Sequence, residues 1–182
     1  MTSRILVALL ASTIGLCASR VVGQTDFGPE IEILSQGSVN GVSAGDLDGA
    51  PGADVFAGAE SPSTLYVAFQ GAGGTWSDTE LTPGSRSRAV ELGDLDGDGD
   101  LDLVYSDFGG SLFWRSNDLD VSGTFLPRQE LGMVGGAQGV FIVDLDGDGN
   151  GEGDLDGLLA GRIDDAYYWF ENVGGDGSSW TQ

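Results

Sequence analysis

The chain has 182 residues, with 7 basic and 29 acidic side chains and no histidine, which gives a formal net charge of −22 at pH 7. So negative a chain is not expected to bind nucleic acid or an anionic membrane surface, because both are bound through clustered Lys and Arg. Disorder is not expected either, since 4 Trp, 4 Tyr and 8 Phe, many of them in β-branched runs, predict a packed core.

Residues 1–23 have the features of a secretory signal peptide. Arg4 precedes an apolar run that begins at Ile5, and Gly23 supplies the small residue near the expected cleavage point. The run is too short and too often interrupted by Ser and Thr to span a bilayer, so membrane insertion is not expected. We therefore expect a secreted, extracellular protein of residues 24–182, from which the only cysteine, Cys17, has been removed.

After this segment, the same order of features recurs three times at a spacing of about 50 residues. Each repeat is predicted to begin with a strand, pass through an acidic loop into a second strand, and continue into a third, aromatic strand. The predicted first strands are residues 39–44, 89–92 and 140–143. The second strands are 54–57, 101–105 and 158–162, and the third strands are 65–69, 112–114 and 167–170. Fourth strands are predicted at 76–81 and 125–131.

Four short strands separated by glycine-rich turns, without helical periodicity, are typical of a β-propeller blade. The predicted fold is all-β, with about three blades of four antiparallel strands at residues 36–84, 85–134 and 135–182, which makes a partial or truncated propeller. The aromatic strands should be buried between neighbouring blades, and the third unit should lack a fourth strand after Trp180. Three hypotheses remain for the missing blades: the chain is a truncated gene product, which is the favoured one, it is one part of a longer protein, or it closes by assembling with copies of itself.

The acidic loop of the second repeat has the spacing of a calcium site. Counted from Asp94 as position 1, carboxylates stand at positions 1, 3, 5 and 9, and the Asp100 carbonyl is available at position 7; the four carboxylates are those of Asp94, Asp96, Asp98 and Asp102. Such closely spaced negative charges converge only around a hard cation. An EF-hand is rejected, because position 12 is Tyr105 instead of a bidentate Glu and no helices flank the loop.

The other two acidic loops depart from this pattern. In the first, Asp46, Asp48 and Asp54 hold positions 1, 3 and 9, but Ala50 and Pro51 replace the ligand at 5 and the glycine at 6. The third loop begins with Asp144, Asp146, Asp148 and Asn150. It is closed either by Asp156, after an insertion at 151–154, or by Glu152, and an overlapping register that starts at Asp148 could hold another ion. The sequence therefore predicts up to three Ca²⁺ sites.

These repeats resemble the FG-GAP and VCBS repeats of integrin alpha propellers and of many secreted microbial proteins. The resemblance is carried by residues 93–104, by 144–150 together with 158–161, and more weakly by 45–56. It implies a calcium-binding propeller, with ligands at Asp94, Asp96, Asp98 and Asp102 and at the Asp100 backbone. It also implies adhesion to an extracellular protein or a glycan.

The favoured function is a non-enzymatic binding, adhesion or scaffold module whose inter-strand loops are made rigid by Ca²⁺. The alternative is a fragment or accessory domain of a carbohydrate-active enzyme with a propeller fold. No catalytic residue is predicted, because the processed chain has no histidine, lysine or cysteine and no Gly-x-Ser-x-Gly elbow. Arg86, Arg88 and Arg115 are candidates for binding an anionic ligand, or simply partners of surface acids.

Overall fold

A computed structural model describes residues 30–35, 37–61, 63–81, 86–147 and 154–182. The chain divides into two compact units, Met1–Ile31 and Glu32–Gln182. The first unit, which includes the predicted signal peptide, lies outside the described residues except for Glu30 and Ile31.

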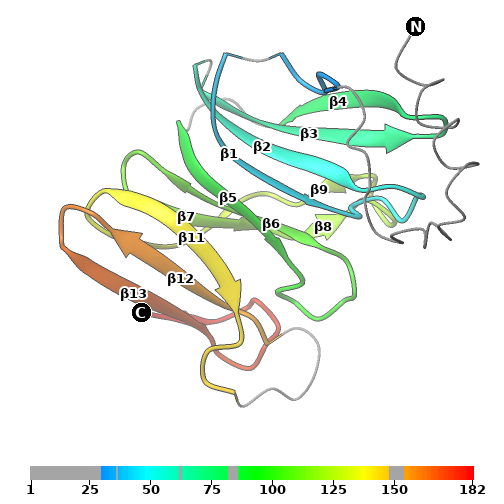
Figure 1. The fold of residues 1–182 in the computed structure, drawn as a ribbon. Coiled ribbons are helices and arrows are strands. Elements are labelled where there is room, and N and C mark those ends of the chain that lie inside the picture. Colours follow the sequence, from blue (N-terminus) through cyan, green and yellow to red (C-terminus); the bar gives the residue numbers. More distant parts are fainter. Residues whose placement is uncertain (1–29, 36, 62, 82–85, 148–153) are drawn as a thin grey trace, which may run out of the picture. The chain divides into compact units, whose positions relative to one another are not determined.

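The second unit is built from three four-stranded antiparallel sheets (Figure 1). The first sheet has its strands in chain order and consists of β1 (Ser38–Gly45), β2 (Asp54–Ser61), β3 (Thr64–Gly71) and β4 (Thr75–Leu81). The second consists of β5 (Ser87–Gly93), β6 (Asp102–Asp107), β7 (Ser111–Arg115) and β10 (Gln129–Met133). The third consists of β11 (Ala137–Val143), β12 (Asp156–Gly161), β13 (Ala166–Asn172) and β14 (Trp180–Thr181). This all-β architecture of repeated propeller-type blades confirms the predicted fold class.

Two details of the predicted strands were wrong. The segment 125–131 is not one strand, because Phe125 belongs to a separate two-stranded hairpin of β8 (Asn117–Asp118) and β9 (Thr124–Phe125). The third sheet does have a fourth strand, since Trp180 pairs with Asn172 and Thr181 with Glu171. Two residues are enough for this pairing, so the third blade is shorter than its neighbours without lacking a strand.

The first core cluster lies between the first and second sheets. Residues alternate across each strand, so Leu103 and Tyr105 of β6 point to one side of the second sheet and Val104 points to the other. On the first side they meet residues from the first sheet, among them Phe56, Leu65 and Val67. Tyr105 also stacks on Phe113, with ring centroids 5.2 Å apart. The facing sides of the first and second sheets therefore bury each other.

The second core cluster repeats this arrangement between the second and third sheets. Val104, Leu112 and Trp114 of the second sheet pack against Leu159 and Phe170 of the third. Figure 1 shows β5 with β1 on one side and β11 on the other, in agreement with the packing of the two clusters. The burial predicted for the aromatic strands is thus confirmed for β3 and β7.

For β13 the burial prediction was wrong in part. Phe170 is completely buried, but Tyr167 and Trp169, which point to the opposite side of the strand, are exposed. The physical reason is that alternate side chains need a sheet on each side, and the described residues place no further sheet beyond the third.

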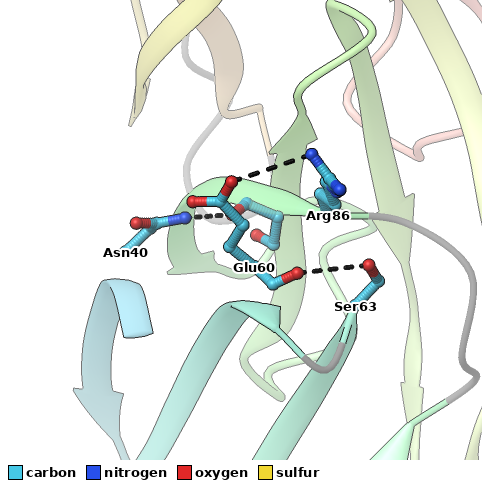
Figure 2. Close-up of polar contacts among 5 residues, drawn as sticks. Asn40, Glu60, Ser63 and Arg86 are labelled. Carbon is cyan, nitrogen blue, oxygen red and sulfur yellow. Dashed lines mark hydrogen bonds and ion pairs between the residues drawn. The ribbon is translucent and has the colours of Figure 1, made fainter. Parts of the chain in front are cut away.

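A polar seam joins the first two sheets at the end opposite the acidic loops (Figure 2). The Arg86 guanidinium lies 3.8 Å from the Glu60 carboxylate, and the Asn40 side chain donates a hydrogen bond to the Ser87 carbonyl. Ser63 donates to the carbonyl of Glu60. Because the Arg86–Glu60 pair is exposed to solvent, it stabilises the fold only slightly.

The other two arginines that were candidates for an anionic ligand also have structural partners. Arg88 donates to Gln138 of the third sheet and lies 4.0 Å above the ring of Phe108. Arg115 is buried and donates to the Leu126 carbonyl. These contacts favour the structural interpretation of the arginines over ligand binding.

Among the described residues, no helix is long and apolar enough to cross a membrane.

Truncation of Leu159, which is completely buried in the second core cluster, should destabilise the unit. We expect Leu159→Ala to lower the free energy of unfolding by about 2–5 kcal/mol, because the cavity adds to the lost transfer energy. Leu126, which is 40% exposed, is the matched control, and Leu126→Ala should cost less than about 1 kcal/mol. Denaturant unfolding of the purified variants measures both values, and equal losses would contradict the packing described here.

Candidate metal centre

The second acidic loop, residues 94–102, brings three carboxylates together. Oxygens of Asp94, Asp96 and Asp102 all lie within 4.8 Å of one another. The loop connects β5 to β6, so two paired strands fix its ends: Gly93 is opposite Asp102 in the register. Of the carboxylates predicted as ligands in this loop, those at positions 1, 3 and 9 therefore converge, whereas the Asp98 carboxylate is not part of the cluster.

The first of these aspartates folds the loop through its own side chain. Asp94 accepts hydrogen bonds from the backbone N–H groups of Gly97 and Gly99, at 2.8 and 3.0 Å. Gly97 has φ of 74°, and the equivalent Gly49 and Gly147 both have 68°. A side chain at this position would force a strained left-handed conformation, so glycine recurs there in all three loops.

One oxygen of this cluster is left without a partner. Asp96 Oδ1 is buried and has no hydrogen-bond partner within the described part of the chain. Burial raises the pKa of Asp96, an effect that a hydrogen bond from Ser116 opposes, and the charges of Asp98 and Asp94 raise it further. A buried carboxylate oxygen that lacks a donor is costly unless a cation lies against it. The donor set and this unpartnered oxygen fit a hard, oxygen-preferring divalent ion.

The first acidic loop, residues 46–54, forms a similar cluster in spite of its altered sequence. Oxygens of Asp46, Asp48 and Asp54 lie within 4.8 Å of one another. Asp46 accepts from Gly49 N–H and Asp48 accepts from Ala50 N–H, each at 2.9 Å. The replacements at positions 5 and 6 thus leave positions 1, 3 and 9 close together, with Asp46 and Asp48 more exposed to solvent than their counterparts.

The third acidic loop is described only at its two ends. Asp148, Asn150 and Glu152, which were predicted as ligands or alternatives, lie outside the described residues. Asp144 accepts from Gly147 N–H at 2.7 Å, which repeats the turn of the other loops. Among the residues that are described here, Asp144, Asp146 and Asp156 do not form a cluster of the kind seen in the first two loops.

The aspartate that ends each acidic loop and begins the second strand has a structural role that is the same in all three repeats. Asp54, Asp102 and Asp156 are almost completely buried, with exposed fractions of 1%, 0% and 2%. In each, Oδ2 accepts the N–H of the leucine at position 2 of the loop, at 2.8 to 3.1 Å. Each Oδ1 accepts the N–H of a residue at or near the end of the third strand, namely Gln70, Asn117 or Asn172. These carboxylates therefore tie the loop to the third strand of the same sheet.

A second set of hydrogen bonds continues from one sheet to the previous one. The Asn117 side-chain amide donates to the carbonyl of Leu47, in the first loop, at 2.9 Å. The Asn172 amide donates to the carbonyl of Leu95, in the second loop, at 2.7 Å. Both amides are buried and each also bonds a carbonyl of its own repeat, Leu101 or Leu155.

Together these bonds make a continuous relay between the acidic loops. Within the second repeat, the Asp102 carboxylate accepts hydrogen bonds from the backbone N–H groups of Asn117 and Leu95. The Asn117 side chain donates to the Leu47 carbonyl in the first loop. The Leu95 carbonyl accepts from the Asn172 side chain of the third sheet. The same groups that shape a candidate metal loop therefore also fix the junction with the neighbouring sheet. A change in the conformation of an acidic loop is therefore expected to alter the hydrogen bonds at the junction with the neighbouring sheet.

The relay asparagines were missed by the sequence analysis. Asn117 lies 15 residues after Asp102, and Asn172 and Gln70 each lie 16 residues after Asp156 and Asp54. This nearly constant spacing was the available signal. The sequence analysis assigned Asp54, Asp102 and Asp156 only as metal ligands, because a sequence does not show which backbone N–H groups a buried carboxylate will meet.

Desolvation dominates the electrostatics of the second loop. Burial raises the pKa of Asp102 to about 7, although the N–H groups of Asn117 and Leu95 act in the opposite direction. Burial also raises the pKa of Asp100. The nearby negative charges raise it further, and these belong to Asp98, Asp120, Asp94 and, in the first loop, Asp46. The loop therefore resists carrying its full negative charge when no cation is bound.

Comparison with known protein families matches the FG-GAP-like repeat at residues 52–105 and again at 94–152. The two matches together span residues 52–152, which is more than half of the chain, and include both junctions between the three repeats. The chain is therefore a member of the FG-GAP-like repeat family, as the sequence resemblance predicted. Repeats of this family indicate a β-propeller-like binding module. A search of curated proteins gave no match.

Loss of a relay asparagine should weaken the junction that it bridges. We expect Asn172→Ala to lower the free energy of unfolding by about 1–3 kcal/mol, because the buried Leu95 carbonyl loses its donor. Asn40→Ala is the control: Asn40 also donates to a carbonyl of the next sheet (Figure 2). Because Asn40 is exposed, its loss should cost less than about 0.5 kcal/mol. A similar loss in both variants would contradict the relay.

Stability in metal-free solution should depend on pH through Asp102. The pKa of Asp102 in the folded state, about 7, exceeds the ordinary aspartate value of 3.8, so between these values the folded state binds the proton more tightly than the unfolded state. The contribution to stability is present at low pH and is lost as pH rises from about 4 to about 7. Chemical unfolding in chelator should therefore give higher stability at pH 5 than at pH 8.

The Asp102→Asn variant isolates this contribution, since it cannot titrate at that position. It should show a smaller pH difference than the unmodified chain, whatever its stability at one pH. An identical pH dependence in both proteins would assign the effect to other carboxylates.

Proposed function

We propose that this protein is a secreted, non-enzymatic binding module in which Ca²⁺, held by the acidic loops, makes the junctions between sheets rigid. One observation carries the calcium part of the proposal: Asp94, Asp96 and Asp102 converge, and Asp96 Oδ1 is buried without a hydrogen-bond partner. A bound cation offsets both the mutual repulsion of the carboxylates and the cost of that buried oxygen.

Calcium is the ion that this donor set favours. Ca²⁺ accepts several carboxylate oxygens in flexible geometry, whereas Mg²⁺ demands a strict octahedron and retains its waters. In the second loop, Asp94, Asp96 and Asp102 would hold the ion, and Asp98 with the Asp100 carbonyl would complete the shell. In the first loop, Asp46, Asp48 and Asp54 would do so. For the third loop the proposed ligands remain Asp144, Asp146, Asp148, Asn150 and Asp156.

The relay explains what the ion would do for the fold. Asp102 bonds the Leu95 N–H, and the Leu95 carbonyl accepts from Asn172 in the next sheet. A cation that fixes Asp102 and its loop therefore also holds Leu95 in place at the sheet junction. Calcium binding would thus stabilise the stacking of the sheets and the surface that they present.

The binding role and the extracellular location rest on family membership and on the predicted signal peptide. We propose an extracellular protein or a glycan as the partner, because FG-GAP repeats indicate a propeller-like binding module. The sequence has no histidine, the most common general base, and no lysine, which supports a non-enzymatic role. The binding-module proposal does not depend on which of the three loops hold calcium.

Removal of one ligand should abolish calcium-dependent stabilisation at the second loop. For a dissociation constant of about 10⁻⁴ M, millimolar Ca²⁺ should stabilise a filled site by about 1.4 kcal/mol. We expect Asp96→Asn to lower the melting temperature measured in Ca²⁺ and to leave the melting temperature in chelator equal or higher. Scanning calorimetry with and without Ca²⁺ measures this difference.

Asp165→Asn is the matched control, because it removes the same charge from an exposed position between β12 and β13, outside the acidic loops. This variant should keep the full effect of Ca²⁺. If the unmodified protein melts at the same temperature in Ca²⁺ and in chelator, the calcium proposal is wrong.

A further inference from the structure

A buried hydrogen-bonded path connects the first acidic loop to the second. It begins at Asp102, whose Oδ1 accepts the backbone N–H of Asn117 at 2.8 Å. The Asn117 side-chain amide donates to the Leu47 carbonyl at 2.9 Å, and the Leu47 N–H donates to Asp54 Oδ2 at 2.8 Å. Asp54 and Asp102 each belong to one of the two clusters of converging carboxylates. The path therefore runs from a candidate ligand of one loop to a candidate ligand of the other.

All four residues of this path are closed to solvent, since none is more than 3% exposed. Water is therefore not at hand to replace a bond that breaks, and a group that loses its partner stays unsatisfied. The members of a buried hydrogen-bonded network consequently keep their positions together. A restraint on one end of the path should restrain the other end as well.

The Asn117 side chain has one orientation that satisfies its neighbours. Its Nδ2 donates to the carbonyls of Leu47 and Leu101, and its Oδ1 accepts the N–H of Leu119 at 3.1 Å. A flipped amide would place its oxygen against two carbonyls and its nitrogen against an N–H group. Because Asp102 holds the backbone N–H of the same residue, Asn117 connects the two loops without a freely rotating link.

The coupling expected from this path is an effect of ordering. To hold an ion, a loop must keep its carboxylates in one arrangement, which costs conformational entropy. When the second loop is filled, Asp102 is restrained, and the path restrains Leu47 and Asp54 with it. The first loop then needs less additional ordering to hold its own ion, so its affinity should rise.

Electrostatic repulsion between two bound cations acts in the opposite direction. Burial is the main cause of the raised pKa of Asp100, but the charge of Asp46 in the first loop adds to it, so charge in one loop acts on the other. Asp46 and Asp48 are exposed, and at an ionic strength of 0.15 M the Debye length is about 8 Å. Salt therefore screens this repulsion but leaves the buried hydrogen bonds intact, and we expect the ordering effect to prevail at that salt concentration.

We propose that Ca²⁺ binding at the second acidic loop raises the Ca²⁺ affinity of the first loop, and that Asn117 is the residue through which the two loops are coupled. The expected factor is about fivefold or more, which is typical of coupled sites. By thermodynamic linkage, filling the first loop raises the affinity of the second by the same factor. This inference rests on the proposed function, since it requires that both loops bind Ca²⁺.

Amide NMR signals can measure the filling of each loop separately. Gly49 N–H donates to Asp46 and Gly97 N–H donates to Asp94, so their signals report on the first and the second loop. Ca²⁺ titrations in 0.15 M salt should compare the unmodified chain with Asp96→Asn, whose second loop lacks a ligand. In the variant, the midpoint at Gly49 should move to a Ca²⁺ concentration about fivefold higher.

A double-mutant cycle assigns this difference to Asn117. Asn117→Ala keeps the backbone N–H of that residue but removes the amide that reaches the first loop. With Asn117→Ala present in both proteins, the Gly49 midpoints with and without Asp96→Asn should differ by less than about twofold. The charge lost with Asp96 is the same in both comparisons, so the cycle also removes that contribution.

Asn40→Ala is the matched control for the cycle. Asn40 also donates from the first sheet to a carbonyl of the second, but it lies outside both loops and off the path (Figure 2). With Asn40→Ala present in both proteins, the fivefold difference should remain.

Hydrogen exchange gives a second measurement that does not require the Asn117→Ala variant to fold. In Asp48→Asn, whose first loop lacks a ligand, Ca²⁺ in the second loop should still slow the exchange of Leu47 N–H through the path. Ala53 N–H is the control amide, because it lies in the same loop but is bonded to Gln70, off the path. Ca²⁺ should slow the exchange at Leu47 more than at Ala53, whereas a general gain in stability would slow both equally.

The possible outcomes separate this inference from the proposed function. Equal or lower Gly49 midpoints in Asp96→Asn would overturn the coupling, because the loops would then bind independently or repel each other's ions. A fivefold difference that persists with Asn117→Ala, or equal slowing at Leu47 and Ala53, would overturn it too. If Ca²⁺ shifts neither the Gly49 nor the Gly97 signal of the unmodified chain, the proposed calcium function is itself wrong.

Discussion

The structure depends on one buried carboxylate that is repeated in every blade. Asp54, Asp102 and Asp156 end the acidic loops and begin the second strands, where each accepts two backbone N–H bonds at a site closed to water. Such a charge is tolerated in the interior only if donors or a cation offset its desolvation. The N–H groups hold the loop against the third strand, and the position of the loop then sets the position of the next sheet.

This constraint links the candidate metal centre to the packing of the blades. The relay from Asp102 through Leu95 to Asn172 means that the loop and the sheet junction are one hydrogen-bonded structure. The apolar cores on both sides of the second sheet supply most of the burial, and the relay fixes the register in which they meet. A cation in the loop would thus act on sheet stacking through bonds that already exist without it.

Residues at equivalent positions of the three repeats differ where their packing differs. Glycine recurs where the next sheet approaches closely, and valine replaces it where no sheet follows among the described residues. Leu145 keeps the leucine of the buried positions but is exposed, and Gln70 keeps an amide at the first sheet. These differences follow the faces on which no neighbouring sheet packs among the described residues.

Much of this protein could be predicted from its sequence, because the decisive information is local and repeated. The alternation of strands, the glycine of each loop turn and the spacing of Asp94, Asp96 and Asp102 follow from backbone conformation and charge within a few residues. Only the tertiary structure decided which oxygens face backbone N–H groups, that Asn117 and Asn172 join one sheet to another, and that Tyr167 and Trp169 are exposed. Those outcomes depend on contacts between residues up to 77 positions apart, and no local pattern specifies which partner a buried polar group will meet.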